Sequence, residues 1–247
     1  MRTRVLGGTV AALLLAGCGS GGDGPHLGMP EPASEQGEHI LDLWQGFFVA
    51  AAVVSAIVAG LIIYVVLRYR RRGDEGADGS EPDQNPYNIP LEILYSVTPV
   101  LVVIGLFAFS SATQDDVDDL VDDPAVEVDV VGFQWQWRFE YPEEGIDLIG
   151  TPEDGPPELV LPRGEVVRFD LSAEDVVHSF WVPEFIEKRD LIPGVDNELD
   201  ITPTRDGTFT GRCAEFCGLD HWRMSFTVRI VEPAEYEAWV AEQQASG

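Results

Sequence analysis

The chain has 247 residues, which is enough for one or two domains. Its 43 acidic residues outnumber its 15 basic residues and give a formal net charge of -28. Such a charge repels phosphate backbones, which argues against nucleic-acid binding, and it would attract a cationic partner. A surface suited to a saline habitat is the alternative explanation of the same composition.

The N-terminus has the parts of an export signal. A basic start, MRTR, precedes the apolar stretch VLGGTVAALLLAG, which is too short to span a membrane, and the run LAGC ends at Cys18. This pattern resembles a bacterial lipoprotein signal, so we expect residues 1–17 to be removed and Cys18 to be lipidated. Residues 18–42 would then form an exported tether. The alternative is an ordinary signal peptide cut nearby, which would leave Cys18 as a free thiol.

Two uncharged runs predict a transmembrane helical hairpin over residues 43–114. The runs cover residues 43–67 and 93–114, and each is long enough for a helix that crosses a bilayer, which needs about 20 apolar residues. Pro99 should kink or loosen the second helix. RYRRR follows the first run, and the positive-inside tendency places that end in the cytoplasm. We therefore expect the chain from about Asp115 onward to lie on the outer face of a bacterial plasma membrane.

The sequence after the hairpin changes to a period of two. The stretch AVEVDVVGFQWQWRFEY, which starts at Ala125, alternates apolar and polar residues as a half-buried strand does. Further short runs are rich in β-branched and aromatic residues and are separated by Pro and Gly, a pattern typical of an all-β sandwich or barrel. We expect residues 115–235 to form this domain and residues 236–247 to form a C-terminal helix or tail.

The run TGRCAEFCGLDHWRM, residues 210–224, gathers Cys213, Cys217, His221 and Met224. An exported domain favours a disulfide, but so small a loop brings little entropic benefit, and the disulfide would leave the histidine and methionine unexplained. Zinc takes four good ligands, and a thioether is a poor ligand for it. Thiolate, thioether and imidazole together indicate copper instead.

A copper site of this kind needs a second imidazole. His178, in AEDVVHSFWVP, is the other histidine of the expected domain. A histidine between apolar neighbours is more often a core residue, but here the cluster lacks an imidazole and His178 can supply it. The resulting set contains one thiolate more than a mononuclear blue-copper site, which takes one Cys, two His and a weak Met.

The pattern of these residues resembles subunit II of the haem–copper cytochrome c oxidases. The resemblance runs from the two spans through GFQWQWRFEY, EDVVHSFWVP and KRDLIPG to the cysteine loop, over about residues 40–235. It implies a cupredoxin-like Greek-key barrel with a binuclear copper centre, CuA. Two bridging cysteines, two terminal histidines, a weak methionine and one backbone carbonyl would bind the metal. In chain order, these ligands are His178, Cys213, Glu215 (through its carbonyl), Cys217, His221 and Met224.

The same resemblance assigns roles to residues around the centre. Trp135 would receive electrons from cytochrome c, whereas packing in the core beside Trp137 is the alternative. Glu174 and Asp175 would dock a lysine-rich cytochrome c, and a solvated loop is the alternative for both.

Two more glutamates gain a role from the resemblance. Glu92 would lie at a proton-uptake entrance at the cytoplasmic end of the second span, and an ordinary interfacial charge is the alternative. The Glu215 side chain would contact a magnesium ion between this chain and subunit I, and solvent exposure is the alternative.

The resemblance implies the electron-accepting subunit of a proton-pumping cytochrome c oxidase. Its copper centre would accept electrons from cytochrome c, or from a cytochrome c domain, and pass them to haem in subunit I, where oxygen is reduced to water. Further oxidase subunits and membrane lipid would be its other partners. No Cys-x-x-Cys-His motif occurs, so we expect no covalently attached haem in this chain.

Three rival families share parts of the pattern. A quinol-oxidase subunit II would lack the copper ligands. The copper domain of nitrous oxide reductase would lack the membrane hairpin and would bring a large catalytic domain. A copper-delivery lipoprotein would need neither Glu92 nor two spans.

Overall fold

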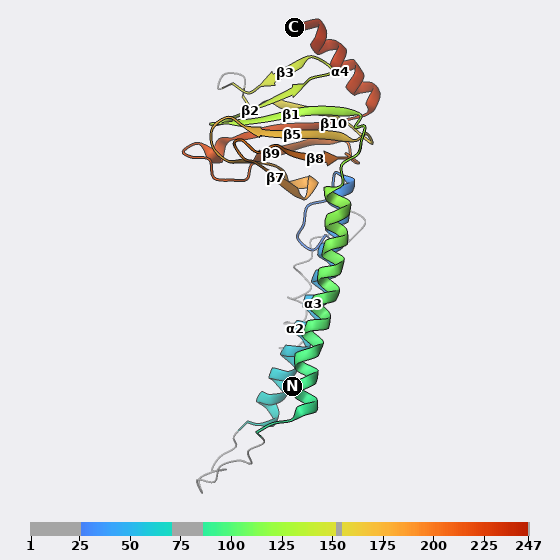
Figure 1. Ribbon diagram of the computed structural model, residues 1–247, viewed down its shortest axis with the longest axis vertical. Helices are drawn as coiled ribbons and strands as arrows, with labels where there is room; N and C mark the ends of the chain where they lie inside the picture. The colour runs from blue at the N-terminus through green and yellow to red at the C-terminus, as the bar shows by residue number, and fades with distance from the viewer. Residues whose placement is uncertain (1–25, 71–85, 152–154, 247) are drawn as a thin grey trace, which may run out of the picture. The chain divides into compact units, whose positions relative to one another are not determined.

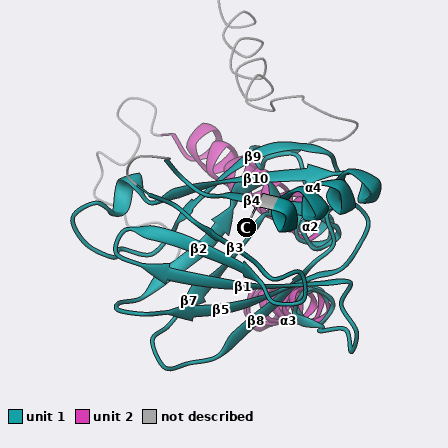
Figure 2. Ribbon diagram, turned by 90° about the horizontal axis from the view of Figure 1, so that it is seen from above, with its two compact units in different colours: residues 1–42, 113–247 teal, residues 43–112 magenta. Residues whose placement is uncertain are grey.

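The computed structural model describes residues 26–70, 86–151 and 155–246 (Figure 1). The chain separates into two compact units, coloured in Figure 2. One unit, Leu43–Ala112, is helical, and the other contains an all-β domain. We describe each unit by itself.

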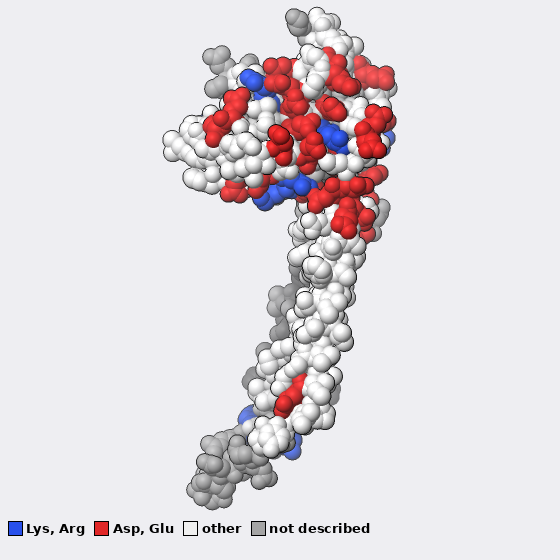
Figure 3. Space-filling model, in the orientation of Figure 1, with Lys and Arg blue, Asp and Glu red and all other residues white. Residues whose placement is uncertain are grey.

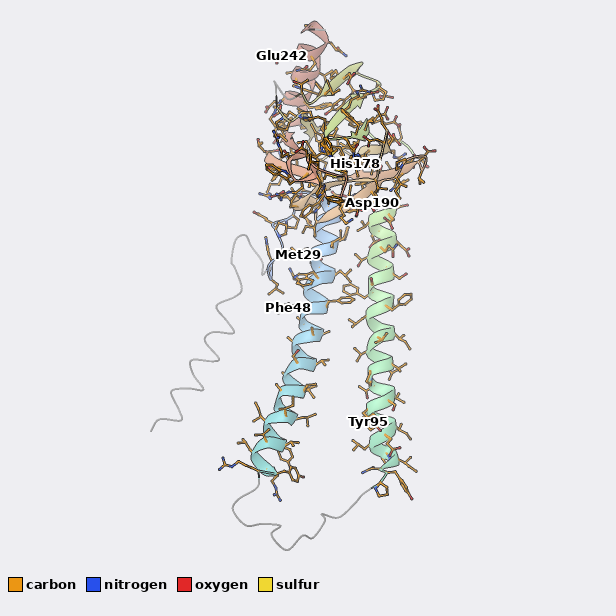
Figure 4. The ribbon with its side chains drawn as sticks, turned by 90° about the vertical axis from the view of Figure 1, so that its left-hand side faces the viewer. Met29, Phe48, Tyr95, His178, Asp190 and Glu242 are labelled. Atoms are coloured by element: carbon orange, nitrogen blue, oxygen red, sulfur yellow. The ribbon has the colours of Figure 1, made fainter. Side chains whose placement is uncertain are left out.

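The helical unit is built from two long helices. Helix α2 covers Glu35–Arg68 and helix α3 covers Ile89–Asp118, and both are long and apolar enough to cross a membrane. Figure 4 shows their side chains radiating outward, as expected for helices with an apolar surface. A Cβ atom on Gly46 would lie 2.9 Å from the ring of Phe109, so glycine allows the two helices to approach closely there. Helix α3 continues through Pro99 without interruption.

Helix α2 begins inside the segment that we expected to be a tether, residues 18–42. The Ser34 hydroxyl accepts a hydrogen bond from the Gly37 backbone N–H (3.1 Å), which is the geometry of a helix N-cap. Glu35 and Glu38 place negative charge in the first turn, where the helix dipole favours it. Helix α2 therefore starts eight residues before the expected hairpin boundary at residue 43, and the tether over residues 18–42 stays a prediction.

The β domain contains ten strands in two five-stranded sheets. The strands are β1 Val126–Phe133, β2 Gln136–Tyr141, β3 Ile146–Ile149, β4 Glu158–Pro162, β5 Val167–Ala173, β6 His178–Val182, β7 Glu187–Leu191, β8 Asn197–Ile201, β9 Gly207–Cys213 and β10 Ser225–Val231. The first sheet has the order β3-β2-β1-β5-β8, and the second has the order β4-β10-β9-β6-β7. Figure 2 separates β4, β9 and β10 from β1, β5 and β8. The predicted fold class, a two-helix hairpin followed by an all-β cupredoxin-like domain, is confirmed.

The stretch that we expected to be one half-buried strand forms two antiparallel strands, β1 and β2. Phe133 pairs with Gln136 across a turn, and alternate residues of both strands are buried. Helix α4, Pro233–Ser246, starts three residues before the expected boundary at 236. Tyr236 and Trp239 of this helix are buried, so α4 covers part of the core.

Aromatic side chains fill the space between the sheets. Trp137 is fully buried and packs edge-on against Phe180 and Phe226, with ring centroids 6.2 and 5.2 Å away. Phe180 and Phe226 stack on each other at 5.0 Å. Aromatic rings bury 150–250 Å² each, roughly, so these rings dominate the core. This rigid centre holds the ends of β6, β9 and β10 in place.

Candidate metal centre

The predicted ligands meet at one end of the second sheet. His178 opens β6, Cys213 ends β9, Met224 precedes β10, and Cys217 and His221 lie in the connection between β9 and β10. We call residues 213–224 the metal loop. The Cys213 backbone N–H donates to the Met224 carbonyl (2.9 Å), so the two ends of the loop are hydrogen-bonded to each other.

Cys213 lies in the middle of a group of donor atoms. Its Sγ lies 3.7 Å from Nδ1 of His178 and 3.2 Å from the carbonyl oxygen of Glu215. Its Sγ also lies 3.9 Å from Sγ of Cys217, whereas a disulfide bond is about 2.05 Å long. Both cysteines are free, so the structure contains no disulfide between them.

Cys217 connects the remaining donors to this group. Its Sγ lies 3.6 Å from Nδ1 of His221 and 3.8 Å from Sδ of Met224. The structure therefore brings the donor atoms of all six predicted ligands into one continuous cluster. Within it, the donor atoms of His178, Cys213 and Cys217 all lie within 4.8 Å of one another.

Burial and hydrogen bonds set the protonation of the two thiols. Burial opposes ionisation of Cys213, but hydrogen bonds from His178 and from the backbone outweigh it and lower the pKa of this thiol to about 7. Burial and the neighbouring Cys213 charge raise the pKa of Cys217 to about 12. Near neutral pH, Cys217 therefore keeps its proton and Cys213 is partly ionised, so a metal that binds both sulfurs as thiolates must displace the remaining protons.

Asp175, for which the resemblance implies a docking role, contacts a predicted ligand, and the docking role stays a prediction. Its carboxylate oxygen lies 2.9 Å from Nε2 of His178, and it also accepts the backbone N–H groups of Gln134 (2.7 Å) and Val176 (2.6 Å). Burial acts to raise the pKa of Asp175, but these hydrogen bonds lower it. A carboxylate on the outer nitrogen of a ligating histidine fixes its tautomer and ring orientation. The spacing Asp-x-x-His was the signal for this role in the sequence, and we missed it.

Trp135 contacts the metal loop. Its indole N–H donates to the Cys217 carbonyl (3.2 Å), and the Gln134 side-chain amide donates to the same oxygen (2.7 Å). Gly218 follows with a φ of +123°, and a Cβ there would lie 3.1 Å from the Gln134 amide. Glycine is therefore required at this turn. Trp135 is half-buried, unlike Trp137, which belongs to the core.

The other predicted side chains have surroundings of their own, as far as the structure describes them. Glu174 is exposed and lies 3.7 Å from an Arg138 guanidinium nitrogen. Glu92 accepts the backbone N–H of Asn88 (2.9 Å) at the start of α3, which is a helix-capping contact. The Glu215 residue is exposed. Cys18 and the expected signal peptide lie outside the described residues.

The chemistry of the cluster fits copper. Two thiol sulfurs, two imidazoles and one thioether are soft or intermediate donors, which suit copper, whereas carboxylate and water oxygens suit magnesium or calcium. His178, Cys213, Cys217 and Met224 are each less than 5% exposed, so these donors are shielded from solvent water.

Comparison with known families matches two parts of the chain. The profile described as "Cytochrome C oxidase subunit II, periplasmic domain" matches residues 154–231, and the profile of the transmembrane domain of the same subunit matches residues 24–112. A relative from Streptomyces avermitilis, described as "Probable cytochrome c oxidase subunit 2", is 38% identical over an alignment 287 positions long. The match covers 100% of this chain and 89% of that relative.

More distant relatives give the same family. "Cytochrome c oxidase subunit 2" of Mycobacterium bovis is 31% identical over an alignment 289 positions long, which covers 94% of this chain and 78% of the relative. Among solved structures, the periplasmic domain of subunit II of cytochrome oxidase from Bradyrhizobium japonicum is 32% identical. That match covers 51% of this chain and 99% of the solved chain, with a TM-score of 0.46.

Proposed function

Because this chain belongs to the cytochrome c oxidase subunit II family, we propose that its β domain holds a binuclear copper centre through the six predicted ligands. Membership of the family makes the chain part of an oxidase complex and implies association with subunit I. The continuous cluster of donor atoms around Cys213 and Cys217 is the observation that carries the copper proposal. Bound copper would supply one-electron redox chemistry.

The residues around the cluster hold the ligands in fixed positions. Asp175 orients His178 through Nε2, so Nδ1 faces the sulfur of Cys213. Gln134 and Trp135 hold the Cys217 carbonyl from the first sheet. Ligands that are held in place from two sheets need little rearrangement when the charge of the centre changes, which favours rapid electron transfer.

In this proposal the β domain receives electrons from cytochrome c through Trp135 and delivers them to haem in subunit I. The hydrogen bond between the Trp135 indole and the Cys217 carbonyl supports this role, because it connects a half-buried aromatic ring to a predicted ligand. Glu174 and Asp175 would contribute to docking of cytochrome c, and their exposure supports that role.

The remaining parts of the proposal concern the membrane. Helices α2 and α3 would cross the plasma membrane of a bacterium, with the β domain on its outer face and a lipid on Cys18. The arginines after α2 support this direction. Glu92 would take up protons for a proton-pumping complex, and the exposed Glu215 side chain would contact magnesium at subunit I.

Metal analysis of the assembled oxidase tests the copper centre. We expect two copper ions per chain in addition to any metal in subunit I, together with the electron paramagnetic resonance signal of one unpaired electron shared by two coppers. Replacing Cys217→Ser should abolish that signal. The matched control is Ala214→Ser, which adds a hydroxyl to the same loop and should keep it. One copper per chain, or zinc alone, would refute the proposal.

Electron uptake is tested by replacing Trp135→Phe. The copper content should stay unchanged, whereas the rate of reduction by cytochrome c should fall roughly tenfold or more, equivalent to at least about 1.4 kcal/mol of barrier. Trp137→Phe changes a fully buried ring and serves as the control. It should lower the stability of the domain but leave the rate of reduction by cytochrome c unchanged. Equal uptake rates in the Trp135→Phe variant and the native oxidase would exclude this route.

A further inference from the structure

A row of aromatic rings begins at a predicted copper ligand and runs along β2. The His178 ring lies edge-on against Trp137, with 6.3 Å between the ring centroids, and Trp137 stacks on Phe139 at 6.5 Å. Phe139 and Tyr141 are fully buried, and they point to the same face of β2, as residues two apart in a strand do. Every second residue of β2 therefore adds a ring to the row.

The row continues into α4. Tyr141 packs against Trp239 with 5.3 Å between the ring centroids, and Trp239 packs against Tyr236 at 5.6 Å. The metal loop precedes β10 and α4 follows it, so the row leads toward the end of β10 that lies away from the predicted ligands (Figure 1). We call Trp137, Phe139, Tyr141, Trp239 and Tyr236 the aromatic row.

The last ring of the row can release a proton. The Tyr236 hydroxyl donates to a carboxylate oxygen of Glu144 (3.3 Å), and the other oxygen of Glu144 is buried without a hydrogen-bond partner among the described residues. Burial, followed by the charge of Glu144, raises the pKa of Tyr236, so the phenol is protonated at neutral pH. The Tyr141 hydroxyl donates to the Val160 carbonyl (2.9 Å), which is not a base. Tyr236 is therefore the phenol of the row that can lose an electron and pass its proton to a carboxylate.

A small molecule can reach this end of the row. Trp239 lines a surface hollow of about 400 Å³ together with Ile149, Pro157 and Gln243. The chain has a net charge of -28, and Figure 3 shows carboxylates over much of the visible face of the β domain. An anionic reductant would be repelled by such a surface, whereas an uncharged thiol would not.

The other end of the row adjoins side chains that oxidants damage. Cysteine thiolates are oxidised through sulfenic acid to irreversible products, and methionine is oxidised to its sulfoxide. Cys213, Cys217 and Met224 belong to this class, and their donor atoms belong to the same cluster as those of His178. An oxidant that forms at the centre would therefore attack the predicted ligands unless another group supplies the electron first.

We propose that the aromatic row protects the metal centre by supplying electrons to oxidants that form there and moving the resulting radical to Tyr236. This inference rests on the proposed copper centre, and the row is separate from the electron uptake through Trp135. The oxidant is a hydroxyl radical, which arises with one hydroxide when hydrogen peroxide takes an electron from reduced copper. The reductant that restores the row is a thiol.

The electrons and protons of this reaction balance. The hydroxyl radical takes one electron from Trp137 and becomes a second hydroxide. Trp137 recovers an electron along the row, and Tyr236 loses that electron while its proton passes to Glu144. The second hydroxide takes the proton from Glu144 and becomes water, so the net products are water and the phenoxyl radical of Tyr236. A thiol then returns one electron and one proton to Tyr236 and becomes a thiyl radical.

Peroxide treatment of the full-length, copper-loaded chain in detergent tests this role. After reduction of the copper, hydrogen peroxide should produce a phenoxyl radical that electron paramagnetic resonance detects in rapidly frozen samples. Tyr236→Phe keeps a buried ring and should lose this radical, and Trp239→Phe should lose most of it. Oxidation of Met224, measured by peptide mass spectrometry, should rise several-fold in both variants. Trp181→Phe is the control, because Trp181 packs against Arg212 and lies outside the row.

Any of three results would overturn the inference. The phenoxyl radical could persist in Tyr236→Phe, Met224 oxidation could be equal in the native chain and both row variants, or Trp181→Phe could raise it as much as Trp239→Phe does. The copper signal before peroxide is added tests the proposed function by itself. If it is missing, a ruthenium photo-oxidant attached to an introduced histidine, Leu219→His, generates the oxidant by light, and the phenoxyl radical should again depend on Tyr236.

Discussion

The two sheets of the β domain present outer faces of opposite character. On the first sheet, five carboxylates face one another in a single row across all five strands. Their register is given by successive strand pairs, and the row consists of Asp147, Glu140, Asp129, Asp170 and Glu198. On the second sheet, the corresponding row across β7, β6, β9 and β10 consists of Lys188, Trp181, Arg212 and Ser225.

This difference shows how the negative charge of the chain is distributed. Like charges directly opposite each other destabilise a sheet, so the acidic row costs stability. The second sheet, which carries the candidate metal centre, has cations and an aromatic ring in the same position. This acidic row therefore lies on the sheet that does not contribute the predicted ligands, whereas residues 212–224, with two arginines and two carboxylates, are neutral.

The largest expected loss of stability concerns a buried ion pair within the first sheet. Arg168 binds both oxygens of Asp200 at 2.8 Å, and Asp200 also accepts the Val121 backbone N–H at 2.8 Å. Asp200 is only 2% exposed. Asp200→Asn leaves the Arg168 charge unpaired, and we expect the free energy of unfolding to fall by about 3 kcal/mol. Urea unfolding followed by tryptophan fluorescence measures this loss.

Asp206→Asn is the matched control, because Asp206 forms an exposed ion pair with Arg163. Its loss should be below about 1 kcal/mol. Copper content per folded chain should be unchanged in both variants, since neither residue contacts the candidate metal centre. Equal losses in the two variants would show that burial does not distinguish these pairs.

The next prediction has a smaller expected effect and concerns a contact between the two sheets. Gly132 of β1 lies against His178, and a Cβ atom there would approach the His178 side chain to 3.1–3.2 Å. We expect Gly132→Ala to cost about 1–3 kcal/mol of stability through overpacking. Because the displaced side chain is a predicted ligand, retention of copper during dialysis against a chelator should fall as well. Gly60→Ala has open space around the new methyl group and should retain copper as the native protein does. Unchanged copper retention in Gly132→Ala would contradict the predicted coupling.

The smallest effect concerns the acidic row itself. Burial, followed by the charges of Glu198, Asp129 and Glu127, raises the pKa of Asp170 above its usual 3.8. The folded state therefore binds this proton more readily than the unfolded state, so Asp170 destabilises the fold above its raised pKa. That penalty is relieved as the pH falls through this pKa toward 3.8.

Asp170→Asn removes this penalty at neutral pH. We expect a gain of about 0.5 kcal/mol in low salt, and the gain should shrink as salt screens the row. Glu165→Gln removes an exposed charge outside the row and should give a smaller gain. A gain for Asp170→Asn that is independent of salt would rule out charge repulsion as its cause.

The sequence was sufficient for features that depend on local composition. Hydropathy predicted the two long helices, and residue chemistry grouped His178 with the cysteine run before any distance was known. Features that depend on the register of distant strands could not be predicted. The acidic row, the pairing of Trp181 with Arg212 and the contact of Gly132 with His178 all need the alignment of strands far apart in the chain, and a slip of one residue would reverse every side chain.

Residues before α2 are tied to the end of the β domain. The Ala33 N–H donates to the Glu184 carbonyl (2.7 Å), and the Thr204 N–H donates to the Ala33 carbonyl (2.9 Å). The Thr202 N–H donates to the Gln36 side chain (3.0 Å), across 166 residues of sequence. These bonds can form only after β8 has been synthesised. During synthesis, this segment therefore joins the domain after most of the chain has been made. Contacts this distant in sequence slow folding, so we expect docking of the N-terminal segment to be one of the slow steps in folding of this domain.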